Sequence, residues 1–213
     1  MKNKFKGLFG EFSGRIGNLV VYELNGKTIV RTRPAGPQKK ATGKRKQYQD
    51  DFRYVMKLMQ MALKMVKIGF MEKDKKGTGF KKALGVNLKK YRELERPQTL
   101  EWMELSRGDL AGATDLQTEI LSNGQLKITW DITEEAENSH PHDVIMLLLV
   151  NETNHDFIFN RQYVQRSKGE LIENIPPQKE GELVRGFICF YLPQGYTSNG
   201  MPLVSNSQTF LVE

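Results

Sequence analysis

The stretch DVIMLLLV, from Asp143 to Val150, contains the longest unbroken apolar run in the C-terminal half of the chain. It is much shorter than the roughly 20 apolar residues that a membrane-spanning helix needs. A short apolar run bounded by polar segments is typical of a buried β-strand. The run therefore predicts a strand in the core of a β-structured C-terminal region.

Strand-like segments surround this run on both sides. Asn123-Gly124 separates two of them, Thr118 to Leu121 and Gln125 to Thr133, and this dipeptide favours the tight turn of a hairpin. The spacing of the segments is typical of an antiparallel sandwich. Further strands are expected at Leu100 to Leu110, Asp156 to Tyr163, Glu170 to Ile175, Leu183 to Leu192 and Ser207 to Val212.

A second hairpin is expected near the start of the chain, in NLVVYELNGKTIVRTR from Asn18 to Arg33. A two-residue turn at Asn25-Gly26 pairs Tyr22 with Ile29 and Val21 with Val30. Neither face of this ribbon is purely polar, and an isolated hairpin is marginally stable in water. We therefore expect other parts of the chain, or another subunit, to cover it.

Two helices are expected between the hairpin and the later strands. The first covers Gln47 to Met71, because apolar residues recur there at steps of three and four. The second follows Phe80 and is interrupted near Gly85. The core stripe of the first helix is expected to contain Phe52, Val55, Met56, Met59, Leu63, Val66 and Phe70.

These elements predict an α+β fold: an N-terminal β-hairpin with amphipathic helices, then an antiparallel β-sandwich like those of immunoglobulin and fibronectin type III domains. A domain boundary is expected at Arg96-Pro97, which gives a basic module at 1–97 and an acidic module at 98–213. The chain's 213 residues are enough for a full core without disulfides.

Charge is divided unevenly along the chain. Residues 1–100 contain 25 Lys and Arg and 8 Asp and Glu, whereas residues 101–213 contain 7 and 17. A basic region of this kind favours a polyanion, a membrane surface or an acidic partner, and attraction between the two halves explains it equally well. The candidate phosphate-binding residues are Arg31, Arg33, Lys39, Lys40, Lys44, Arg45 and Lys46, with Tyr22 or Tyr48 available to stack on bases.

Catalytic and metal-binding patterns are weak. His140, His142 and Asp143, with His155 further on, lack a recognised zinc spacing and are expected in a solvated loop. The single cysteine, Cys189, excludes an internal disulfide and sits among apolar residues typical of a core strand. We expect no enzyme activity, no catalytic residue, no metal, no cofactor and no small-molecule substrate.

Three segments together resemble an uncharacterised bacterial family of about this length, classed as a domain of unknown function. They are FSGRIGNLVVYELNGKTIVRTRP at Phe12 to Pro34, WMELSRGDL at Trp102 to Leu110, and LKITWD at Leu126 to Asp131. The resemblance covers almost the whole chain and implies no activity, cofactor or site residue. The C-terminal half is also similar in style to fibronectin type III and immunoglobulin-like sandwiches, which favours binding or assembly.

The leading hypothesis is a non-enzymatic structural or interaction protein that self-associates or binds a protein partner, as in a homomeric or phage-like assembly. The alternative is a nucleic-acid-binding protein that uses residues 27–46. The N-terminal MKNKFKGLFG lacks the apolar region of a secretory signal, so a cytoplasmic location is expected and leaderless export stays open.

Overall fold

The protein is described here by a computed structural model covering residues 13–24, 26–33, 36, 40–71, 79–132, 138–160, 162–193 and 203–212. The chain divides into two compact units, Met1–Gly43 and Lys44–Glu213. The first contains a small antiparallel sheet, and the second contains all the described helices and two further sheets.

The N-terminal sheet has three strands in sequence order: β1 (Gly14–Ile16), β2 (Leu19–Leu24) and β3 (Lys27–Thr32). The predicted register is confirmed, because Tyr22 lies opposite Ile29 and Val21 opposite Val30. Gly26 has a φ of 75°, which suits the expected turn, while Asn25 lies outside the described residues. The strand β1 was not predicted and extends the hairpin by one strand.

The helices are α1 (Gly43–Met61), α2 (Leu63–Gly69) and α3 (Gly79–Glu93). The helix expected at Gln47 to Met71 therefore begins earlier, at Gly43, and it breaks at Ala62. The expected interruption near Gly85 is wrong, because α3 runs through this exposed glycine without a break. None of the described helices is both long and apolar enough to cross a membrane.

The predicted core stripe of the first helix is partly correct. Val55, Met59, Val66 and Phe70 are buried, as expected. Phe52, by contrast, leaves 43% of its surface exposed, because the chain buries the side of α1 that carries Val55 and Met59 and leaves the side that carries Phe52 uncovered.

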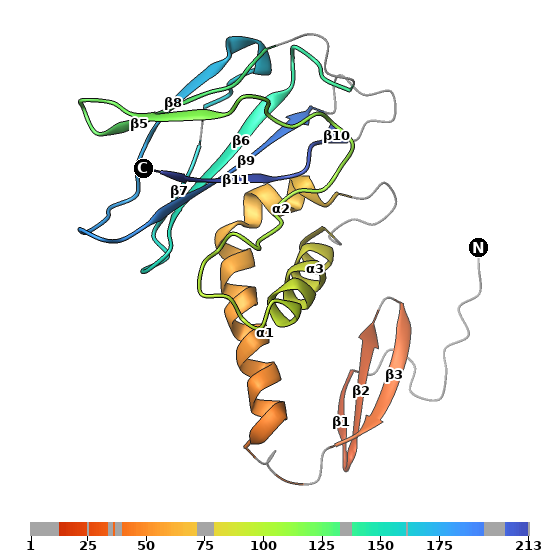
Figure 1. Cartoon of the computed structure of the whole chain (residues 1–213). Helices are drawn as coiled ribbons and strands as arrows, with labels where there is room; N and C mark the ends of the chain where they lie inside the picture. Colours follow the sequence, from red (N-terminus) through yellow and green to blue (C-terminus); the bar gives the residue numbers. More distant parts are fainter. Residues whose placement is uncertain are drawn as a thin grey trace, which may run out of the picture. The chain divides into compact units, whose positions relative to one another are not determined.

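The C-terminal strands form two antiparallel sheets, shown in Figure 1. The smaller has the order β4-β5-β8, from β4 (Gln117–Ile120), β5 (Gln125–Thr129) and β8 (Glu170–Asn174). In the larger, β9 (Val184–Leu192) pairs with β6 (Val144–Asn151), and β6 pairs with β7 (Phe157–Phe159). The other edge of β9 pairs with β10 (Leu203–Val204) and β11 (Gln208–Val212).

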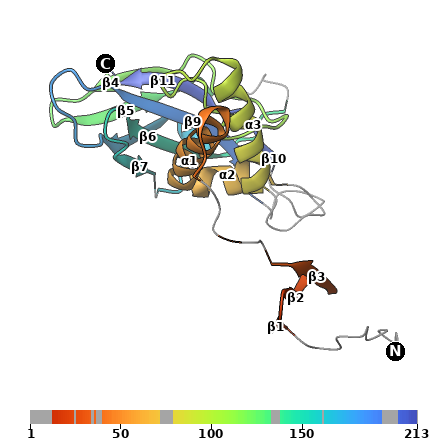
Figure 2. The same ribbon diagram turned by 90° about the horizontal axis from the view of Figure 1, so that it is seen from below.

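The larger sheet is covered on both faces, and this makes the second unit a three-layer structure. Met146, Leu148 and Val150 of β6 face a core shared with the helices. Ile145 and Leu147, which alternate with them, face a core shared with β5 and β8. Figure 2 shows the three helices grouped beside β9. The buried strand predicted at Asp143 to Val150 is confirmed.

The strand expected at Leu100 to Leu110 is absent; only Leu110 makes a single bridge, to Ser205. The segment instead runs along α3 as irregular chain and buries its apolar side chains against the helices. Asn87 of α3 substitutes for a strand neighbour: its Nδ2 donates to the Glu104 carbonyl at 2.7 Å and its Oδ1 accepts from the Glu104 amide at 2.8 Å. Extended backbone is thus held by one buried amide side chain.

The fold is α+β with a sandwich-like C-terminal arrangement, as predicted. The division of the chain into compact units falls after Gly43, whereas the sequence analysis places a domain boundary between 1–97 and 98–213. The difference has a physical cause, since the helices share a hydrophobic core with β6 and β9. The helices therefore pack with the sandwich in one unit.

One buried carboxylate joins α1 to the end of α3. Asp51 is 3% exposed, and its two oxygens accept hydrogen bonds from Arg96 Nε at 2.8 Å and Arg92 Nε at 3.1 Å. Glu95 and Arg96, just after α3, have positive φ angles of 55° and 64°, which are uncommon for residues other than glycine. Arg96 makes its contact with Asp51 from this left-handed backbone conformation. The hydrogen bond from Arg96, aided by Arg92, holds the pKa of Asp51 below its usual value.

Replacing Asp51 tests this junction. Because its pKa is lowered on folding, the carboxylate stabilises the fold above its unfolded pKa, and this contribution disappears as the pH falls through the folded pKa. We expect Asp51→Asn to lower the free energy of unfolding by about 2 kcal/mol near neutral pH, measured by urea denaturation. The difference in the free energy of unfolding between wild type and Asp51→Asn should become smaller as the pH is lowered.

The neighbouring Asp50 provides a matched control. Its side chain is 48% exposed and pairs with Arg53 across one turn at 2.9 Å. Asp50→Asn should change stability by less than about 0.5 kcal/mol, because exposed ion pairs contribute little. Equal effects of the two substitutions would show that the Asp51 junction is not what stabilises this end of α1.

Candidate functional site

The N-terminal sheet carries most of its positive charge on one face. Arg15, Val20 and Arg31 lie opposite one another across the three strands and therefore point to the same side. Alternation along β3 adds Lys27 and Arg33 to that side. We call this surface the basic face.

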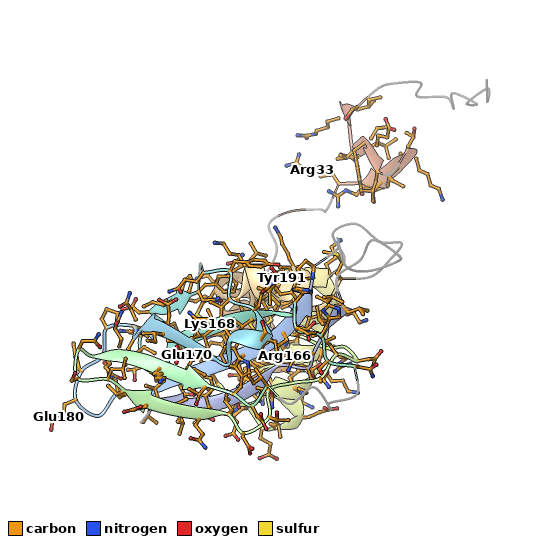
Figure 3. The ribbon with its side chains drawn as sticks, turned by 90° about the horizontal axis from the view of Figure 1, so that it is seen from above. Arg33, Arg166, Lys168, Glu170, Glu180 and Tyr191 are labelled. Carbon is orange, nitrogen blue, oxygen red and sulfur yellow. The ribbon has the colours of Figure 1, made fainter. Side chains whose placement is uncertain are left out.

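The basic face also contains an aromatic ring. Tyr22 is half-buried and lies on the same side as Arg31, whose guanidinium carbon is 5.6 Å from the ring centre. The side chains of Arg15, Lys27, Arg31 and Arg33 are all exposed. Figure 3 shows Arg33 on this sheet. Exposed cations interleaved with an aromatic ring form a surface that suits anionic ligands with planar groups.

The opposite face of the sheet holds four apolar residues together with the polar Glu23, Thr28 and Thr32. Ile16, Leu19, Val21 and Val30 lie on it, and only Val21 is fully buried. Ile16 is 46% exposed and Val30 is 42% exposed. We call this surface the apolar face. Apolar residues lie on both faces of the ribbon, as the sequence analysis expected, because Val20, Leu24 and Ile29 share the side of the cations.

The structure divides the predicted phosphate-binding residues between the two units. Arg31 and Arg33 lie on the basic face, and Lys40 is exposed just before the boundary. The other described members, Lys44, Arg45 and Lys46, are exposed in the first turn of α1. Lys39 lies outside the described residues.

Sequence reasoning missed Arg15, and it included Lys27 in the range 27–46 without naming it as a candidate residue. Lys27 belongs to the predicted hairpin, and its side follows from the register that pairs it with Leu24. Arg15 is placed by β1, whose three residues are too few to give a recognisable alternating pattern.

The histidines do not form a metal site. The rings of His140 and His142 stack with centres 5.2 Å apart, but the carboxylate of Asp143 is turned inward and paired with Arg166 at 2.9 Å. His155 lies against Tyr54, away from this loop. Within the described residues no three His, Cys, Asp or Glu side chains are grouped closely enough to hold a metal ion.

Other candidate catalytic groups are held in structural contacts. Cys189 is fully buried in β9, and burial raises the pKa of its thiol to about 12. Ser106 donates its hydroxyl to the Ser205 carbonyl at 2.6 Å. Glu104 is bound by Lys90 and Arg107. A thiol that is buried and protonated is a poor nucleophile.

The reactivity of Cys189 provides a direct test of its burial. At about pH 8 an ordinary cysteine reacts readily with iodoacetamide, because its pKa is near 8.5. We expect Cys189 in the native protein to react at least about a hundredfold more slowly than in urea-unfolded protein, measured by mass spectrometry. Rapid labelling of the native protein would contradict the position of Cys189 in the core.

Comparison with known proteins identifies a family but no activity. A search of curated proteins finds no match. Residues 11–207 match a family model described as "Family of unknown function (DUF6266)", a range that includes the N-terminal sheet, all three helices and most of the C-terminal strands. The expected membership in a family of unknown function is thus confirmed: the chain belongs to DUF6266.

Proposed function

We propose that this protein is a non-enzymatic interaction protein that assembles with further copies of itself through its N-terminal sheet. The observation that carries the proposal is the incomplete cover of the apolar face. Strands of three, six and six residues are too small to build a closed core. Ile16 and Val30 remain nearly half exposed, and a contact with another chain would bury them.

Charge supports a second copy as the partner. Residues 1–43 contain nine Lys and Arg against two Asp and Glu, whereas residues 101–213 contain seven against seventeen. The second unit as a whole, residues 44–213, contains 23 Lys and Arg and 23 Asp and Glu, so the attraction acts between the basic N-terminal sheet and the acidic, strand-rich part of a neighbouring copy, and it would guide docking. A head-to-tail contact of this kind generates rings or filaments.

The architecture of the C-terminal strands also supports a binding role. Three strands, β4-β5-β8, face a larger sheet in which β9 and β6 are central, and β8 returns to pair with β5. β10 and β11 pair with successive parts of the same edge of β9, so the larger sheet, among the described residues, is four strands wide. Sandwiches of three strands against four are typical of immunoglobulin-like and fibronectin type III modules. By analogy of fold, such modules favour binding or assembly over catalysis.

The molar mass in solution tests the assembly. We expect light scattering of the full chain to give a mass above 24.5 kDa that rises with concentration in the micromolar range. Val30→Asp should shift the protein to monomers, because it places a charge on the apolar face. Ile120→Asp is the matched control: Ile120 on β4 is also a β-branched residue with 42% exposure. A wild-type protein that stays monomeric would overturn self-assembly.

Nucleic-acid binding is a second candidate function, and the basic face is the observation that favours it. Four exposed cations and Tyr22 share one side of the sheet, and a basic β-ribbon suits a phosphate backbone. Lys40, Lys44, Arg45 and Lys46 would extend the contact along the chain. The observed geometry adds Arg15 and Lys27 to the residues that sequence reasoning named.

Salt-dependent binding of labelled single- and double-stranded nucleic acid tests this candidate. If all four cations of the basic face contact phosphates, their replacement by serine should reduce the slope of log affinity against log salt by about 3 to 4. Replacing Lys64, Lys67, Lys81 and Lys89 of the second unit, which are exposed or partly exposed, removes the same charge and should leave the slope unchanged. Unchanged binding by the basic-face variant would reject this site.

A further inference from the structure

The first half of α1 carries a second apolar stripe, of which Met56 packs partly against the core while the other members face outward. Tyr48, Phe52 and Met56 recur at steps of four residues and therefore lie along one side of the helix. Tyr48 is 52% exposed and Phe52 is 43% exposed, whereas Val55 and Met59 on the neighbouring side are fully buried. This helix thus has one stripe in the core and another facing outward.

The outward stripe forms the floor of a groove of about 800 Å3 whose wall consists almost entirely of apolar atoms. Arg92 of α3 forms part of this wall. Its Nε binds Asp51 at 3.1 Å and its guanidinium lies 4.7 Å from the centre of the Tyr48 ring. These contacts fix the position of the Tyr48 ring, so the groove is formed before any ligand arrives.

The rim of the groove is positively charged. Arg45 and Arg53 line it, and Lys44 and Lys46 lie next to Arg45 in the first turn of the helix. That turn contains no acidic residue, although a helix N-terminus favours negative charge. Among the residues that the structure describes, Asp50 pairs with Arg53. The groove therefore combines an apolar floor with unbalanced positive charge.

We propose that this groove binds an acidic amphipathic helix of another protein. Apolar side chains at steps of three and four residues on the partner would bury Phe52, Met56 and the exposed part of Tyr48. Carboxylates beside those side chains would face Arg45 and Arg53 and would be favoured by the start of α1. This site differs from the N-terminal sheet in both its residues and its partner, so it does not depend on the self-assembly proposed above.

Two other occupants fit the groove less well. The same stripe from a second copy would bring Arg45 and Arg53 toward their own equivalents, which is repulsive. A nucleic acid needs accessible ring faces on which its bases can stack, but Arg92 covers one face of Tyr48. Contact with the apolar floor lowers the free energy of binding when aliphatic side chains are buried there, and nucleic acids have no such side chains.

A synthetic peptide of known sequence tests the proposal with the full chain. The probe is a fluorescein-labelled peptide of about 20 residues, with leucine at helical steps of three and four and glutamate and alanine elsewhere, a length and composition that favour helix. Two controls replace its glutamates by lysine or scramble the order of its residues. We expect the acidic amphipathic peptide alone to bind, with an affinity that falls as salt is added.

Variants of the protein then locate the contact. Phe52→Ser should weaken binding of the acidic peptide by about tenfold or more, because it removes an apolar anchor at the centre of the groove. Arg45→Glu should weaken it by about fivefold, and more strongly at low salt. Both side chains are exposed, so the fold should be kept, as circular dichroism would verify.

Two matched substitutions outside the groove serve as controls. Phe157→Ser changes a phenylalanine on β7 that is 49% exposed, and Lys81→Glu reverses an exposed charge in α3 eleven residues before Arg92. Neither should affect binding of the peptide. No binding of the acidic peptide, equal binding of the scrambled peptide, or equal losses in groove and control variants would overturn the proposal. A mass that halves on Phe52→Ser without peptide binding would instead assign the groove to self-contact.

Discussion

The burial of β6 on both faces is the constraint on which the second unit depends. Every residue of this strand is buried, and alternate side chains enter different cores. A strand with two covered faces must be apolar throughout, since successive side chains point in opposite directions. Removing either the helices or the smaller sheet would expose half of its side chains to water. The helices and the sandwich are therefore interdependent parts of one packed unit.

Buried polar groups mark where the ends of this central strand meet the rest of the chain. Asp143, just before β6, is paired with Arg166, whose guanidinium lies over the Phe190 ring, with its central carbon 3.7 Å from the ring centre. Arg166 is labelled in Figure 3 and also donates to the Gly112 carbonyl at 2.9 Å. At the other end, the Asn151 amide side chain donates to the Pro177 carbonyl at 3.0 Å. Such contacts satisfy backbone groups that the ladder leaves unpaired, and their pairing fixes where the strand begins and ends.

Sequence patterns predicted which strands pair, and in what register, better than they predicted which side chains are buried by neighbouring elements. The register of the first hairpin followed from Asn25-Gly26, because a two-residue turn leaves no freedom in the pairing. The strand at Asp143 to Val150 was predictable because no polar residue interrupts it. The exposure of Phe52 was not predictable, since helical periodicity shows which residues share a side and not how far the covering partner extends. The segment Leu100 to Leu110 was assigned to a strand because its apolar residues are frequent, yet Asn87 holds its backbone without a sheet.

The candidate site was predictable in its chemistry and only in part in its geometry. Charge counts located the cations, but the side of the sheet that each one occupies depends on β1 and on the register. The residues of the two proposed binding surfaces also differ from the residues of the core in how many partners they have. Inside the second unit, carboxylates such as Asp51 and Glu104 are paired with cations and Cys189 is fully buried. These groups therefore stabilise the fold and do not face a ligand.

The apolar face of the N-terminal sheet and the outward stripe of α1 are different, because their apolar side chains contribute little to any core that the described residues form. Exposed aromatic and β-branched residues are costly in water unless another surface covers them. On the outward stripe of α1, cations accompany the apolar residues, so the preferred covering surface there is apolar and acidic. On the N-terminal sheet, the cations lie on the other side from the apolar face. Binding is therefore the role that best accounts for the residues that folding leaves exposed.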